Sequence, residues 1–136
     1  MTATVKKVRD EGKENYKVFL DRSKQFYETI GISEKSGRWA AVGLNAVHCA
    51  ISMNDALTVY FLSKRSISED HRTAADLLSE IPEEGVGGQA SNYKRILAKK
   101  NAVAYEGREF RKNEALEVAK QAERFYQWGL NKLPKQ

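Results

Sequence analysis

The sequence predicts an all-α protein, an antiparallel bundle of four or five helices. Apolar residues recur at helical spacing in five segments, and no segment shows the alternation of a half-buried strand. The 136 residues include only 9 glycines and 2 prolines, and Pro82 and Pro134 both lie at segment ends. A chain of this length can bury one core without disulfides. We therefore expect a single helical domain over residues 14–133, after a flexible arm at residues 1–13.

The first two predicted helices are the clearest. The first is expected over residues 14–30, where Gly31 ends the apolar pattern. The second and longest covers residues 37–64 and is apolar nearly all round, which is typical of a central, buried helix.

In the second half of the chain, the sequence pattern predicts three more helices. Ser66–Glu69 has the spacing of a capping box and opens the third helix, which ends at Pro82. Residues 82–91 are expected to form a loop, whose glycines lack the Lys-Ser/Thr that a phosphate-binding loop requires. The fourth helix is expected over residues 92–106, and Asn113 caps the fifth.

Composition and charge exclude some classes of protein. The net charge of +5 permits an RNA, nucleotide or acidic protein partner, but no basic stripe with interleaved aromatics is visible. The lone Cys49 cannot form an internal disulfide, which suits a reducing compartment. No signal peptide is recognisable, and no apolar run reaches the roughly 20 residues that span a bilayer. We expect a cytoplasmic protein that does not bind membranes.

A polar stripe runs along the predicted central helix. Asn45, His48, Ser52 and Asp55 follow one another at spacings of three, four and three residues, so they share a face. Polar groups on a buried helix need partners. They either bond to another helix or line a cleft, and His48 is correspondingly either a satisfied interior histidine or a cleft-lining group.

A second polar group closes the predicted fourth helix. Lys100 shares a face with the apolar residues of that helix, where a charge is costly unless it is paired or reaches water. Tyr105 lies one turn after Asn101, so an amine, an amide and a phenol gather at one helix end. In the alternative reading, Lys100 extends its amine to water, Asn101 supports the helix end, and Tyr105 is a core residue bonded to a backbone carbonyl. The apolar residues of this face are Tyr93, Ile96, Leu97 and Ala104.

Three segments, in this order, resemble the HEPN superfamily of small helical-bundle proteins. They are the small-residue helix at residues 45–57, the short helix at residues 69–78, and residues 97–107 followed by a last helix ending at residues 122–128. The resemblance extends over about residues 14–133 and implies the HEPN bundle fold. Active HEPN proteins are metal-independent RNases with an arginine followed, after four to six residues, by a histidine. Other members bind nucleotides or partner a minimal nucleotidyltransferase in toxin–antitoxin pairs.

The resemblance places the family's arginine on Lys100, or on Lys99, and its tyrosine on Tyr105. No histidine follows, because Ala104 or Tyr105 occupies that position. RNA cleavage of this type needs a base that works near neutral pH, as imidazole does. Tyrosine, with an ordinary pKa of roughly 10, is a poor base there, and lysine lacks the planar fork of arginine. We therefore do not expect RNase activity of the family type.

The expected function is accordingly binding of a nucleotide or RNA without turnover. Lys100 would meet a phosphate, with Asn101 and Tyr105 on the nucleotide and Asn45, His48 and Asp55 as further ligand-binding candidates. A divergent RNase toxin in which Tyr105 or His48 replaces the missing histidine is one alternative. A partner of a small nucleotidyltransferase, with Tyr105 as its contact or modification point, is another.

The sequence also allows predictions about cofactors, metal ions and the oligomeric state. His48 and His71, the only histidines, have no cysteines or carboxylates at ligand spacing, so neither a metal nor another cofactor is expected. The resemblance implies a homodimer, and Phe125, Tyr126 and Trp128 leave room for an interface. Alternatively, these aromatic side chains pack on the first helix.

Overall fold

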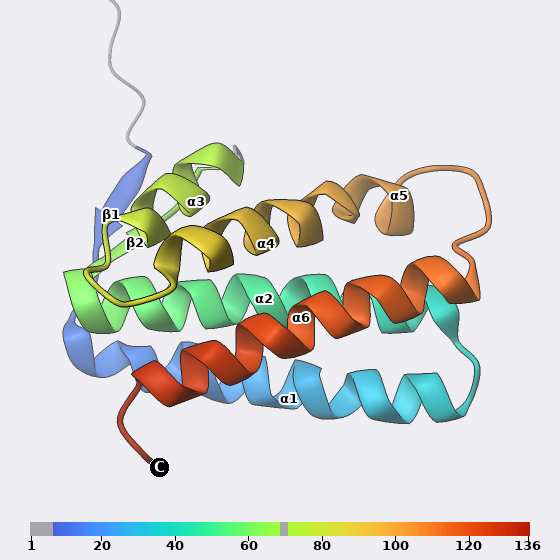
Figure 1. Ribbon diagram of the computed structural model, residues 1–136, viewed down its shortest axis with the longest axis horizontal. Coiled ribbons are helices and arrows are strands. Elements are labelled where there is room, and N and C mark those ends of the chain that lie inside the picture. Colours follow the sequence, from blue (N-terminus) through green and yellow to red (C-terminus); the bar gives the residue numbers. More distant parts are fainter. Residues whose placement is uncertain (1–6, 69–70) are drawn as a thin grey trace, which may run out of the picture.

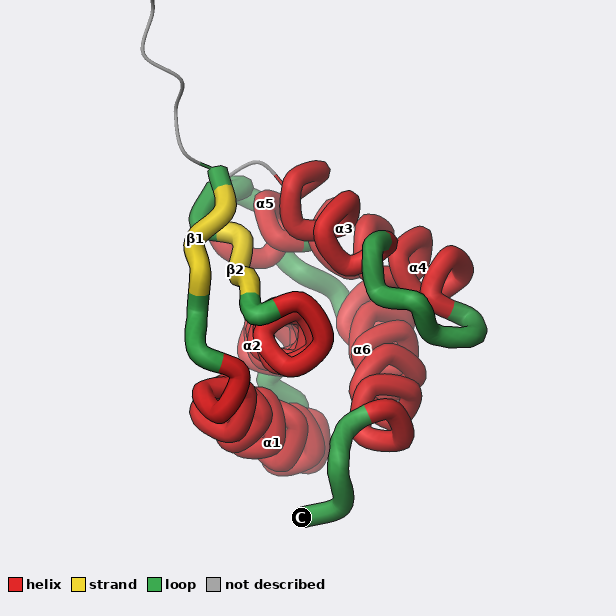
Figure 2. The backbone as a smooth tube through the Cα atoms, turned by 90° about the vertical axis from the view of Figure 1, so that its left-hand side faces the viewer, coloured by secondary structure: helices red, strands yellow, loops and turns green. Residues whose placement is uncertain are grey.

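The central element of the fold is a long buried helix around which the other elements are arranged. The computed structural model describes residues 7–68 and 71–136. Figure 2 shows the central helix end-on, with the other helices and a small sheet around it. An all-α bundle is thus confirmed as the main architecture. The three long helices are α1 (Tyr16–Lys35), α2 (Trp39–Leu62) and α6 (Lys112–Lys132).

Three shorter helices cover the side of α2 that α1 leaves open (Figure 1). Trp128 donates its indole N–H to the carbonyl of Glu84 at 3.2 Å, and Asn92 donates to the carbonyl of Gln121 at 3.0 Å. Both bonds hold the second of these helices against α6. The three are α3 (His71–Ser79), α4 (Val86–Ala98) and α5 (Lys100–Ala104), and a 3-10 turn at Lys13–Asn15 precedes α1.

The small sheet was not predicted. β1 (Val8–Asp10) pairs antiparallel with β2 (Lys64–Ser66), and Arg9 lies opposite Arg65. Strands of three residues are too short to show an alternating pattern. The sheet forms because Ser63, left-handed at φ +52°, ends α2 and turns the chain back toward β1, which lies within the segment expected as a flexible arm.

Helix boundaries differ from the predictions in two ways in the first half of the chain. α1 continues through Gly31 to Lys35, because one glycine costs a helix only about 1 kcal/mol, which packing along its length offsets. The left-handed residue comes later, at Gly37 with φ +66°. The predicted capping box includes Glu69, which lies outside the described residues, and Ser66 belongs to β2.

The predicted loop and fourth helix are also revised. α4 begins at Val86, after the left-handed Gly85, so the loop expected over residues 82–91 is shorter. The helix expected over residues 92–106 is divided at Lys99, whose N–H bonds to the carbonyl of Ile96 and tightens the last turn. α6 begins at Lys112, with Arg111 at the N-cap position that was predicted for Asn113.

Two of the three aromatic side chains of α6, Phe125 and Tyr126, are buried in the bundle, and Trp128 is partly buried. Phe125 is fully buried and stacks on Tyr93 of α4, and Tyr126 is 5% exposed. The ring of Tyr126 stacks on Tyr27 of α1 with centroids 4.1 Å apart. Packing on the first helix is therefore confirmed for Tyr126, and Phe125 and Tyr126 leave no free aromatic surface for a dimer interface.

Candidate functional site

A polar pocket of about 250 Å³ lies where α2, β2, α3, α4 and α5 meet. α2 contributes Ile51 and Asp55, one turn apart, and β2 contributes Arg65 and Ser66. Lys100, the first residue of α5, also lines the pocket. The pocket brings a carboxyl, two cationic side chains and a hydroxyl together, although they come from distant parts of the sequence. Ile67, Ser68, Ala74 and Tyr93 complete the lining.

Asp55 and Arg65 form a loose ion pair at the base of the site. Nε of Arg65 lies 3.6 Å from Oδ2 of Asp55, which is beyond hydrogen-bond distance, and the guanidinium lies 4.8 Å from the ring centroid of Phe19. Burial raises the pKa of Asp55 to about 7, and the opposing charges of Arg65 and Arg22 only partly offset this rise. The carboxyl therefore changes its charge near neutral pH.

Two polar atoms at this pocket have no hydrogen-bond partner within the described part of the chain. They are Oγ of Ser66 and Nε of Arg65, and both are buried. Buried polar groups in folded proteins are nearly always hydrogen-bonded. The site therefore retains a hydroxyl and an N–H with which to bind an oxygen-rich ligand.

Lys100 is half-buried at the pocket, and its charge reaches the polar stripe of α2. Burial lowers the pKa of His48, and the positive charge of Lys100 lowers it further, so the imidazole is neutral at pH 7. The ring of His48 lies against Phe26 of α1, with centroids 5.4 Å apart. His48 neighbours the pocket but does not line it.

Asn45, at the far end of the polar stripe, has a local partner. Its side-chain N–H donates to the carbonyl of Ala41 at 2.8 Å, one turn earlier in the same helix. The hydrogen bond of Asn45 is thus to its own helix, and Asn45 lines neither the polar pocket nor the groove between α1 and α6. Of the three stripe residues proposed as ligand-binding groups, Asp55 alone lines the pocket.

Asn101 and Tyr105 lie on the surface beside the pocket, outside its lining. Tyr105 is 74% exposed, so the alternative in which it is a core residue is wrong. The backbone carbonyl of Asn101 accepts the N–H groups of Tyr105 and Glu106 at 2.9 and 3.0 Å, and these bonds end α5. The amine, amide and phenol therefore do not form one enclosed cluster.

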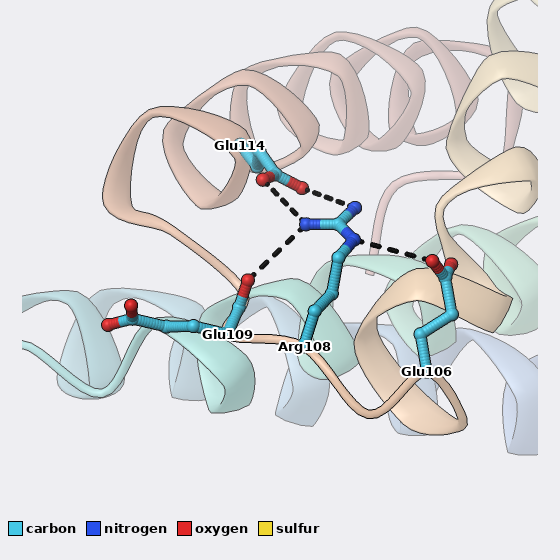
Figure 3. A network of polar contacts seen from close by, with 4 residues as sticks. All are labelled: Glu106, Arg108, Glu109 and Glu114. Carbon is cyan, nitrogen blue, oxygen red and sulfur yellow. Dashed lines mark hydrogen bonds and ion pairs between the residues drawn. The ribbon is translucent and has the colours of Figure 1, made fainter.

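The connection after α5 is held by one arginine (Figure 3). Arg108 bonds both carboxylate oxygens of Glu114, at 2.9 and 3.1 Å, and also contacts Glu106 at 3.3 Å. These bonds lower the pKa of Glu114 and link the end of α5 to the first turn of α6. Deeper in, Gly43 of α2 lets Phe110 approach closely, since an added Cβ would lie 2.5 Å from that ring.

Sequence reasoning missed Arg65, Ser66 and Ser68, and placed Tyr93 only on an apolar face. The one local signal is the run Ser63–Ser68, in which serines and basic residues follow directly on the long helix. The position of these residues beside Asp55 depends on the pairing of β1 with β2, which no local sequence pattern predicts.

Other features restrict the site's chemistry. No group of three or more His, Cys, Asp or Glu side chains in residues 7–68 and 71–136 is arranged to hold a metal ion. Over the same residues, none of the helices has the length and apolar character needed to cross a membrane.

Compared with known proteins, the chain matches no protein-family model and no curated protein. The fold places the protein in the class of all-α helical bundles, and the polar pocket is its candidate ligand-binding site.

Proposed function

We propose that this protein is a HEPN-like module that binds a nucleotide or RNA through a phosphate in the polar pocket, without cleaving it. The observation that carries the proposal is the convergence of Lys100 and Arg65 on one pocket beside the hydroxyl of Ser66, which has no hydrogen-bond partner among residues 7–68 and 71–136. Arginine offers a fork of N–H donors and lysine a point charge, and both are common phosphate ligands. The exposed ring of Tyr105, which directly follows α5, offers a surface on which a base can stack.

The arrangement offers little support for cleavage by the family's mechanism. His48 lies against Phe26 outside the pocket, and Tyr105 is exposed to solvent. Neither side chain lines the pocket, so neither supplies a base there. Binding without turnover fits these residues better than the toxin in which one of them replaces the missing histidine.

Lys100→Glu is expected to weaken binding of a fluorescently labelled oligoribonucleotide at least tenfold, about 1.4 kcal/mol, because it places a negative charge at the phosphate site. Fluorescence anisotropy at fixed salt measures this affinity. Lys99→Glu is the matched control, since it changes the net charge equally at a neighbouring residue that does not line the pocket. Equal losses in both variants would show that overall charge, rather than the pocket, governs binding.

One observation favours an enzymatic alternative. Asp55, with a pKa of about 7, is a carboxyl base inside the pocket beside two cations. The same labelled RNA, analysed by gel electrophoresis after incubation, distinguishes the two functions. Binding alone leaves the RNA intact, whereas cleavage that disappears in Asp55→Asn would establish a divergent RNase.

The exposure of Tyr105 also favours the third function, that of a partner for a small nucleotidyltransferase. A hydroxyl on a ring that is 74% exposed is accessible to a modifying partner. Intact-mass measurement of the protein co-expressed with such an enzyme tests this, and Tyr105→Phe is the control.

A further inference from the structure

A groove of about 400 Å³ separates α1 from α6. It shares no lining residue with the polar pocket. Nothing in the proposed function uses this groove. Its walls are Tyr27, Glu28, Ile30, Gly31 and Glu34 of α1 and Leu116, Ala119, Lys120 and Glu123 of α6.

The groove lies to one side of the direct contact between the two helices. Both pack on α2, and the stack of Tyr27 on Tyr126 joins them directly. The lining extends from that stack along residues 27–34 of α1 and 116–123 of α6, toward the C-terminal end of α1 and the N-terminal end of α6.

The chemistry of the groove is apolar inside and acidic at the edges. Tyr27, Ile30 and Leu116 supply apolar surface, while Glu28 and Glu123 stand on opposite walls and are exposed. The third carboxylate is Glu34, against one cation, Lys120. Among the described residues none of these three carboxylates forms an ion pair. An acidic groove on a chain of net charge +5 repels nucleic acid and attracts a basic partner.

Gly31 provides a second, independent observation. It lies within α1, where glycine destabilises a helix relative to alanine, and its backbone is helical rather than left-handed. A Cβ added there would meet nothing within 4 Å, so the chain's own packing does not require glycine. A bare backbone at this point leaves the groove open to the close approach of another chain.

We propose that this groove is a docking site for a basic amphipathic helix of a partner protein. The apolar face of the partner would lie on Tyr27, Ile30 and Leu116, and its lysines or arginines would meet the glutamates at the edges. A second copy of this chain fits less well, because two chains of net charge +5 repel one another.

The probe for this site is a synthetic helical peptide of leucine and lysine, with leucines at helical spacing along one face. A peptide with glutamate in place of lysine is its control. We expect the lysine peptide to bind, by fluorescence anisotropy, and to shift the amide NMR signals of residues 27–34 and 116–123. Equal binding of the glutamate peptide, or shifts confined to other residues, would overturn the proposal.

Charge reversal supplies the first variant. Glu28→Lys/Glu123→Lys is expected to weaken binding of the lysine peptide at least tenfold and to create binding of the glutamate peptide. Glu80→Lys/Glu109→Lys makes the same change of net charge at exposed residues outside the groove and is expected to retain most of the affinity. If the two double variants lose affinity equally, the groove is not the docking site.

A leucine at Gly31 supplies the second variant. Gly31→Leu is expected to leave the melting temperature unchanged or raised, because the site is open, while filling the groove and lowering peptide affinity severalfold. Gly88→Leu, at an equally open helical glycine in α4, controls for the effect on stability. Unchanged affinity in Gly31→Leu would contradict the proposal.

Sedimentation of the parent and of Glu28→Lys/Glu123→Lys tests whether a second copy occupies the groove. If the parent is a dimer and this double variant is a monomer, the occupant is a second copy and the proposal of a partner protein is overturned. Neither Gly31→Leu nor the double variant touches the polar pocket, so RNA binding is tested separately.

Discussion

Replacing Phe125 with alanine is expected to lower the free energy of unfolding by about 3–5 kcal/mol. The side chain is fully buried and stacks on Tyr93 at 5.2 Å and on Trp128 at 6.4 Å between centroids. Its removal leaves a cavity between α4 and α6 that rigid neighbours cannot fill. Urea denaturation, followed by circular dichroism, measures the loss.

Tyr105→Ala is the matched control for this experiment. It removes an aromatic ring that is 74% exposed, so stability is expected to change by no more than about 0.5 kcal/mol. A loss in Phe125→Ala as small as that of the control would show that α4 and α6 do not share one packed core. Because Tyr93 lines the polar pocket as well, Phe125→Ala is also expected to weaken RNA binding.

The long helices could be predicted because their signal is local. α1, α2 and α6 each carry apolar residues at helical spacing over many turns, and their buried residues follow that spacing. The start of α4 could not be predicted in this way. Gly87 and Gly88 favour a loop by local propensity, but both are helical here. The bond from Trp128 to Glu84 and the burial of Ala90 hold this segment against the bundle.

The residues of the candidate site likewise fall into those with a local sequence signal and those without one. Asp55 could be singled out from the sequence because it belongs to a polar stripe on a buried helix, and Lys100 because it is a charge on an apolar helix face. Arg65 carries no such signal, and its position depends on the pairing of β2 with β1, more than fifty residues away along the chain. The predicted fourth helix is divided at Lys99, and Tyr105 lies after the end of α5, where it is 74% exposed.

Replacing Asp55 with asparagine is expected to alter how stability depends on pH. The carboxyl has a pKa of about 7 in the folded protein, against 3.8 as the ordinary value. Between these values the folded state binds more protons at Asp55 than the unfolded state, so the contribution of this carboxyl to stability falls as the pH rises from about 4 to about 7. Asparagine cannot ionise, and the variant lacks this loss. The difference in unfolding free energy, variant minus parent, is expected to rise by roughly 2–4 kcal/mol between pH 4 and pH 8.

The measurement is a series of urea denaturations of both proteins at each pH. Taking the difference removes the contribution of His48, whose own pKa is lowered by burial and by Lys100. Asp76→Asn, at an exposed position of α3, is the control and is expected to show no such change. Parallel profiles for parent and Asp55→Asn would mean that Asp55 is charged throughout this range.

The same titration is expected to govern ligand binding, if the pocket holds a phosphate. Below pH 7 the neutral carboxyl of Asp55 no longer competes for the guanidinium of Arg65, 3.6 Å away, so that cation becomes available to the ligand. RNA without a terminal phosphate is the suitable ligand, because its phosphodiesters do not titrate in this range. Its affinity for the parent is expected to rise severalfold from pH 8 to pH 6, while Asp55→Asn binds equally well at both values. An affinity that rises equally in both proteins would assign the effect to His48 instead.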